Sequence, residues 1–246
     1  MSSAPSHGGV GVGAGRRSLR ARLPALTPGQ GSDSGARGRM QREAFVTARG
    51  QFGRPRGVLG WIAGRLMAHG NEAMNRAAFE LLDVQPTDYV LEVGFGPGRL
   101  ITRVARRATE GLVAGVDLSE VMVRQAARRN RAFIRDGRVV LEPGGVSGLR
   151  FPDGQFTKVC AVNSLQFWPA PADDLREIRR VMRYGGRLVL GLRMRGPGPW
   201  GLASPGFTTS EVDEVRQLVR QAGFRDVRTE VRRLPRETAT YIGAQC

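Results

Sequence analysis

Three glycines at alternate positions follow an apolar segment, and they constrain this chain more than any other feature. Residues 90–101 read VLEVGFGPGRLI, with the glycines at positions 94, 96 and 98. A second apolar segment, residues 112–117, ends on Asp117. This order predicts a strand, a tight turn and a helix, then a strand with a carboxylate at its tip. Such a turn lets a ligand approach the backbone closely, and the carboxylate can accept hydrogen bonds from two ribose hydroxyls.

The spacing of the glycines separates two classes of adenosine ligand. Dinucleotide sites read G-x-G-x-x-G, and Arg99 stands here at the position of the third glycine of that pattern. Pro97 lacks an N–H group, and Glu92 would repel phosphate groups while attracting an ammonium group. The segment therefore favours a ligand with an amino-acid tail over one with a pyrophosphate.

Four segments in order resemble the class I S-adenosylmethionine-dependent methyltransferases, most closely their type 11 or UbiE-like small-molecule branch. The similar segments are residues 90–100, 113–122, 149–168 and 175–190. The third begins LRFPDGQF, similar to the family's LPFPDGSFD, and the fourth reads LREIRRVMRYGGRLVL, similar to L-x-E-x-x-R-V-L-x-P-G-G-x-L. The resemblance extends from about residue 59 to the C-terminus. It implies an α/β fold of the Rossmann-like, doubly wound kind, with helices on both faces of a mostly parallel seven-stranded sheet whose last strand is antiparallel.

The same resemblance implies S-adenosyl-L-methionine as the cofactor and assigns nine residues to its site. From the methionine end to the adenine, these are Glu92, Gly94, Gly96 and Gly98 at the methionine moiety, Asp117 at the ribose, Leu118, Met122 and Val146 near the adenine, and Asn163, which faces the cofactor through its backbone. No metal is expected.

Two positions depart from the family pattern. An acidic residue that binds the adenine amino group usually precedes the position of Val146, and the residue here is Gly145. The family's Phe-Asp pair at the start of the fourth strand is Phe156-Thr157. Because a hydrogen bond contributes about 0.5–1.5 kcal/mol, the first change predicts a cofactor affinity lower by several-fold.

The candidate substrate-site residues do not include a clear general base. Many relatives carry a histidine just after the fourth strand, where this chain has Gln166 and Phe167. Gln166 and Trp168 are expected to line the acceptor site. His69 is a weaker candidate, since a surface histidine at a helix end explains it better than a substrate contact does. The sequence therefore predicts methyl transfer by proximity and desolvation. The segment 193–207 is short and rich in Gly and Pro, which leaves residues 45–75 to cover a small acceptor.

Composition narrows the class of protein and its partners. No apolar run approaches the roughly 20 residues of a membrane span, and two cysteines form no disulfide framework, so a cytoplasmic location is expected. The formal net charge is +16, yet Lys158 is the only lysine, and the arginine excess fits a GC-rich genome better than a nucleic-acid partner. Residues 1–60 hold ten arginines against Asp33 and Glu43. A small-molecule acceptor is favoured, and the oligomeric state is left open.

The pattern along the chain predicts three regions: a disordered Gly/Ser/Arg-rich tail at 1–40, an N-terminal helical cap at 41–85 and the methyltransferase domain at 86–246. Strands are predicted at 89–93, 113–116, 138–141, 158–163, 186–192, 226–231 and 240–244, and helices at 100–108, 119–131, 172–183 and 210–222. Two alternatives to a small-molecule methyltransferase stay open at this point. One is a catalytically weak scaffold with the cofactor fold, and the other is an RNA methyltransferase.

Overall fold

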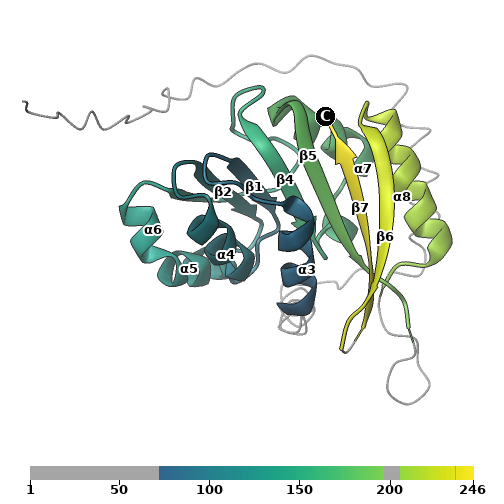
Figure 1. Ribbon diagram of the computed structural model, residues 1–246, viewed down its shortest axis with the longest axis horizontal. Helices are drawn as coiled ribbons and strands as arrows, with labels where there is room; N and C mark the ends of the chain where they lie inside the picture. The colour runs from purple at the N-terminus through teal and green to yellow at the C-terminus, as the bar shows by residue number, and fades with distance from the viewer. Residues whose placement is uncertain (1–71, 197–205, 236) are drawn as a thin grey trace, which may run out of the picture. The chain divides into compact units, whose positions relative to one another are not determined.

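The computed structural model describes residues 72–196, 206–235 and 237–246, which form one seven-stranded sheet with helices on both faces (Figure 1). The spatial order of the strands is β3-β2-β1-β4-β5-β7-β6. Their bounds are β1 Tyr89–Val93, β2 Leu112–Asp117, β3 Val139–Pro143, β4 Phe156–Val162, β5 Met182–Arg193, β6 Arg225–Arg233 and β7 Thr238–Gln245. Pairs among β1 to β5 are parallel, and β7 runs antiparallel to both β5 and β6. The predicted fold class is confirmed.

Helices cover the two faces of the sheet because each buries one apolar stripe against it. In the described residues they are α3 Glu72–Leu82, α4 Arg99–Arg107, α5 Glu120–Arg129, α6 Arg131–Arg135, α7 Pro171–Val181 and α8 Thr209–Gln221, with a short 3-10 helix, η3, at Leu165–Phe167. One apolar cluster joins α3 and α4 to the sheet. The other joins α7 and α8 to the opposite face, where α8 runs beside β6 in Figure 1.

The predicted helix over residues 119–131 ends early, at Arg129, and a short second helix, α6, follows Asn130. This side chain is fully buried, and its Nδ2 donates to the carbonyls of Ala126 and Gly98 at 2.9 and 3.2 Å. Its Oδ1 accepts a hydrogen bond from Thr102 at 2.7 Å. A side chain that binds backbone groups in this way competes with the helix, so the helix ends there.

The predicted helix over 172–183 ends at Val181, and β5 begins at the next residue, earlier than the predicted strand start at 186. The register between β4 and β5 shifts between Phe156 and Lys158, so the first residues of β5 pair irregularly. Apolar alternation does not reveal such an irregularity, because Arg183 to Gly186 carry no apolar side chain except Tyr184, which is exposed.

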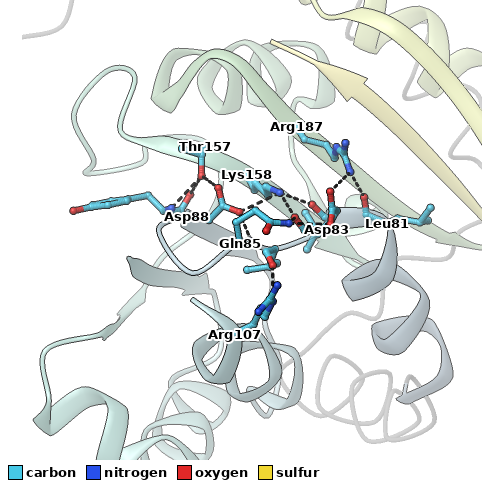
Figure 2. A network of polar contacts seen from close by, with 11 residues as sticks. Leu81, Asp83, Gln85, Asp88, Arg107, Thr157, Lys158 and Arg187 are labelled. Carbon is cyan, nitrogen blue, oxygen red and sulfur yellow. Dashed lines mark hydrogen bonds and ion pairs between the residues drawn. The ribbon is translucent and has the colours of Figure 1, made fainter. Parts of the chain in front are cut away.

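A polar network at the amino ends of β1, β4 and β5 holds the C-terminal end of α3 (Figure 2). Lys158 Nζ donates to the carbonyls of Leu82, at 2.9 Å, and Asp83, and it forms an ion pair with Asp88 at 3.1 Å. Arg187 donates to the carbonyl of Leu81 at 3.0 Å. Cations that bind the last carbonyls of a helix satisfy groups that have no partner inside the helix. The network therefore fixes α3 to the sheet.

Thr157, one of the two departures from the family pattern, belongs to the same network. Its hydroxyl donates to Asp88 at 2.7 Å and accepts a hydrogen bond from the backbone N–H of Tyr89 at 3.0 Å. Burial alone would raise the pKa of Asp88, but hydrogen bonds from the Gln85 backbone, Thr157 and Lys158 outweigh it and hold that pKa below its usual value. Thr157 thus joins two neighbouring strands at their starts.

Most of the predicted cap lies outside the described residues, as does the whole predicted tail, so both stay predictions. The part of the cap that is described, α3, contacts β4, β5 and β7 directly. In the described part of the chain no helix is long and apolar enough to cross a membrane.

Candidate cofactor site

A pocket of about 490 Å³ opens at the carboxyl ends of β1, β2, β3 and β4. In a doubly wound sheet this is the edge where ligands bind, because the chain changes direction between β1 and β4. Five of the predicted site residues line it together: Gly94, Asp117, Leu118, Val146 and Trp168. They come from the ends of different strands, so only the fold brings them into one pocket.

The glycine turn between β1 and α4 is built for close packing. Gly94, Gly96 and Gly98 have φ values of 74°, 55° and 73°, in the left-handed region that disfavours other residues. A Cβ atom on Gly94 would lie 2.5 Å from the Cβ of Ser164, at the end of β4. A Cβ on Gly98 would lie 2.6 Å from the Cβ of Ala126, so this glycine is needed where α4 begins against α5.

Asp117 holds the turn as well as facing the pocket. Its Oδ2 accepts a hydrogen bond from the backbone N–H of Gly96 at 2.7 Å, and its Oδ1 accepts one from the backbone of Ser119 at 2.8 Å. Ser119 in turn caps α5 by accepting from the N–H of Met122. A single carboxylate therefore fixes the glycine turn and the start of α5 relative to one another.

Glu92 lies directly beneath the glycine turn, and only 4% of its surface is exposed. Its Oε2 has no hydrogen-bond partner among the described residues. Burial and, secondarily, the negative charge of Asp117 raise the pKa of Glu92 well above its usual value, although a backbone hydrogen bond from Ile101 opposes them. A buried carboxylate oxygen without a partner fits an incoming ammonium group, since the pair would satisfy both ions. These residues fit the amino-acid tail of S-adenosylmethionine.

The far wall of the pocket is the connection between β3 and β4, which α7 holds in place. Asp174 is buried at the start of α7, where its oxygens accept from the Ser147 hydroxyl at 2.6 Å and from the backbone of Ala170 at 3.0 Å. Glu177 accepts from the N–H of Leu149 at 2.9 Å. Arg180 donates to the carbonyl of Leu149, also at 2.9 Å. None of these contacts was predicted from the sequence, which gave only a helix over residues 172–183.

Several predicted site residues do not reach the pocket surface. Glu92 and Met122 are buried and are absent from the pocket lining. Asn163 follows β4 with a φ of 51°, and its neighbour Ser164 lines the pocket. Gln166 donates to the carbonyl of Asn163 at 3.0 Å and is absent from the pocket lining. Gly96 and Gly98 are likewise absent from the pocket lining. His69 lies outside the described residues.

Sequence reasoning missed two charged residues of the pocket lining, Glu142 and Arg150. Glu142 is in β3, where the alternating apolar pattern gave no indication of a pocket. Across the described ranges, no group of three histidine, cysteine, aspartate or glutamate side chains is arranged to hold a metal ion.

Comparison with known sequences finds methyltransferases. Residues 90–186 match the family model described as "Methyltransferase domain". The chain is 29% identical over 184 residues to the uncharacterized methyltransferase YdaC of Bacillus subtilis, covering 75% of this chain and 97% of that protein. It is 33% identical over 154 residues to the 27-O-demethylrifamycin SV methyltransferase of Amycolatopsis mediterranei, covering 58% of this chain and 56% of that protein. The chain thus spans nearly all of the first relative and about half of the second.

Solved structures of low sequence identity share the fold. A SAM-dependent methyltransferase from Aquifex aeolicus has a TM-score of 0.59 at 18% identity, over 74% of this chain and 96% of that one. The 1,6-didemethyltoxoflavin-N1-methyltransferase of Burkholderia thailandensis, solved with S-adenosylhomocysteine, also has a TM-score of 0.59, at 22% identity over 84% of this chain and 87% of that one. Sequence and fold agree, and together these likenesses support a class I S-adenosylmethionine-dependent methyltransferase.

Proposed function

We propose that this chain transfers a methyl group from S-adenosyl-L-methionine to a small-molecule acceptor. The observation that carries the proposal is the pocket itself, which joins Gly94, Asp117 and Val146 at the carboxyl edge of the sheet. Glu92, two residues before Gly94 in the chain, is buried and does not belong to the pocket lining. Relatives support a small acceptor, since their names specify a rifamycin precursor and demethylmenaquinone, the latter for a protein of Symbiobacterium thermophilum.

In this proposal each end of the cofactor meets a different part of the pocket. Glu92 holds the ammonium group, Asp117 holds the ribose hydroxyls, and Leu118 and Val146 pack against the adenine. Leu118 is 55% exposed, so a bound adenine would cover apolar surface that otherwise faces water. When bound, the cofactor supplies a methyl group that its sulfonium already activates.

The residues of the chain then contribute position and exclusion of water. The lining residues include no histidine, lysine, cysteine or tyrosine that would serve as a general base near neutral pH. Trp168 is buried against the pocket, and Phe167 stands 42% exposed at its rim. Two aromatic side chains of this kind can hold a small acceptor in line while they exclude water, and this arrangement favours catalysis by proximity. Trp168 stays our candidate for the acceptor wall, and Gln166 and His69 stay predictions.

Calorimetric titration of the full chain with S-adenosylmethionine and S-adenosylhomocysteine tests the proposal. We expect saturable binding of both at micromolar concentrations, followed by transfer of labelled methyl groups when small acceptors are screened. The fold alone does not decide the reaction, because a [4+2]-cyclase shares it with a TM-score of 0.57 at 21% identity. A folded chain that binds neither ligand would favour the scaffold alternative.

The salt dependence of RNA binding distinguishes an RNA methyltransferase from a small-molecule methyltransferase. Contacts to phosphate groups would make affinity for a transfer RNA fall steeply between about 50 and 200 mM salt. We expect no saturable RNA binding at the higher concentration, measured by fluorescence anisotropy with a labelled RNA. A cytoplasmic location stays a prediction from the sequence.

A further inference from the structure

Strand β6 forms one edge of the sheet, and only one of its sides has a partner among the described strands. It pairs with β7 and stands last in the spatial order, as the outermost strand at that end of the sheet (Figure 1). All of its nine residues are exposed except Val227 and Arg232, which are partly buried. A row of backbone N–H and C=O groups at such an edge can pair with a further strand.

The side chains of β6 divide between the two faces of the sheet. Glu230 pairs in register with Tyr241 of β7, which packs in the cluster with α3. Because side chains alternate along a strand, Arg228 and Arg232 share that face with Glu230. Val231 is on the other face and is 65% exposed. Arg228 is exposed and has no hydrogen bond or ion pair with any other described residue. Both an apolar and a charged side chain are therefore available to a partner.

The sequence of β6 is complementary to itself. Residues 225–233 read RDVRTEVRR, with Thr229 at the centre. If two copies pair antiparallel about a two-fold axis at Thr229, most facing side chains carry opposite charges or are both apolar. The facing pairs are Asp226 with Arg232, Val227 with Val231, Arg228 with Glu230, and Thr229 with its own copy. The register of β6 against β7 shifts between Arg225 and Arg228, which affects the outer pairs and leaves Arg228 with Glu230 as the central charged pair.

The neighbouring registers bring like charges together. Pairing about Arg228 would place Asp226 opposite Glu230, and pairing about Glu230 would place Arg228 opposite Arg232. Like charges directly opposite each other destabilise a sheet. The charges of β6 therefore favour the register about Thr229.

The like-charged pair of the favoured register lies at its ends, where Arg225 would face Arg233. The Arg225 guanidinium is already engaged, because it lies 4.8 Å from the ring centroid of Tyr184 and donates to the carbonyl of Cys246 at 3.2 Å. Tyr184 belongs to β5 and Cys246 follows β7, so these contacts draw the charge of Arg225 away from the open edge.

We propose that β6 pairs with β6 of a second copy of this chain, so that two seven-stranded sheets continue into one another across a two-fold axis at Thr229. In this dimer Arg228 faces Glu230 of the second copy, and Val231 packs against Val227 of the second copy. Strands β5 and β7 separate β6 from β4, the nearest strand of the cofactor pocket, so the dimer leaves that pocket accessible. The dimer does not depend on the proposed function.

Sedimentation velocity of the full chain tests the central charged pair. We expect the wild type to show a monomer–dimer equilibrium at micromolar concentrations. Arg228→Glu should raise the dissociation constant of the dimer at least about ten-fold, because carboxylates then face each other at two symmetric positions. Adding Glu230→Arg to the same chain restores opposite charges and should recover most of the dimer. Arg128→Glu is the matched control, since it makes the same change at an exposed position on α5, which packs against β2 and β3, and it should leave the equilibrium unchanged.

A single introduced cysteine tests the register. Thr229→Cys places two thiols at the axis, within reach of one disulfide. Val231→Cys places each thiol about 14 Å from its copy along the paired strands, which is too far for a disulfide. The native Cys160 and Cys246 are both buried. Under mild oxidation, non-reducing electrophoresis should therefore show a covalent dimer for Thr229→Cys and none for Val231→Cys.

Three outcomes would overturn the proposal. A wild-type chain that stays monomeric throughout the micromolar range refutes it. A dimer that Arg228→Glu leaves intact shows that the copies meet elsewhere. Cross-linking of Val231→Cys as readily as Thr229→Cys shows that the strands do not pair about Thr229. None of these outcomes bears on cofactor binding.

Discussion

Asp117 combines a structural and a binding role in one side chain. Its two oxygens hold the N–H groups of Gly96 and Ser119, so removing them leaves two backbone donors without partners. We expect Asp117→Ala to weaken S-adenosylhomocysteine binding by at least about ten-fold and to lower the free energy of unfolding by about 1–3 kcal/mol. Calorimetry and urea unfolding measure the two effects.

The control for this variant is Asp136→Ala, at an exposed aspartate after α6. It should change neither quantity. Wild-type affinity in the Asp117→Ala chain would remove Asp117 from the cofactor site.

Replacing Glu92 should raise stability while it weakens cofactor binding, whereas replacing Asp117 should lower both. A carboxyl group whose pKa is raised in the folded chain opposes folding once the pH exceeds its ordinary value of about 4.3. At pH 7, Glu92→Gln should therefore raise the free energy of unfolding of the ligand-free chain. The same change should weaken S-adenosylhomocysteine binding about ten-fold or more, because the ammonium group loses its charged partner. A variant that is less stable and binds normally would show that Glu92 has a purely structural role.

At the scale of elements, the network beneath α3 is distinct from the pocket. Thr157 lies near the start of β4 and Ser164 just beyond its end, about 20 Å apart along an extended strand. We expect Thr157→Val to lower the free energy of unfolding by about 1–2 kcal/mol through the lost hydrogen bonds to Asp88 and Tyr89. The affinity for S-adenosylhomocysteine should not change. A clear loss of affinity without loss of structure would mean that the strand start influences the site.

The lowered pKa of Asp88, which the Gln85 backbone, Thr157 and Lys158 together maintain against burial, predicts a dependence of stability on pH. The pKa of Asp88 is lowered in the folded chain, so its contribution is present above the ordinary carboxyl value of about 4 and is lost as the pH falls through the lower folded value. Asp88→Asn should cost about 3–5 kcal/mol at pH 7, because it leaves Lys158 buried without its counter-ion. Urea unfolding of both chains from pH 7 to 3 should show the difference shrinking. A constant difference would contradict this account.

The sequence predicted the bounds of elements whose apolar residues recur regularly. It missed element bounds that depend on side-chain contacts between distant parts of the chain. Strands β1 and β2 and helix α4 lie within a residue of their predicted bounds. The break at Asn130 and the early start of β5 depend on contacts between residues distant in the chain, which local spacing does not contain. The same limit explains why Asp174 and Arg180 were missed, since only the fold places them behind the pocket.

At the scale of the whole molecule, the order of the strands creates the site. The glycine turn and Asp117 were recognisable from sequence because they are close in the chain and follow buried strands. Glu142 and Arg150 were not, because they join the pocket only when β3 and the loop after it reach the same edge of the sheet as β1 and β2. The high net charge gave no information on the site, since most arginines of the described ranges lie on exposed surfaces or in local ion pairs such as those of α7 and α8.

The single lysine of this sequence has a consequence for how the fold can be followed in solution. A protease that cuts only after lysine has one target, the bond between Lys158 and Val159, inside a strand flanked on both sides by β1 and β5. That bond is inaccessible until the centre of the sheet separates. The rate of cleavage at this bond therefore reports how often the core opens. A ligand that slows the cleavage has bound the folded state.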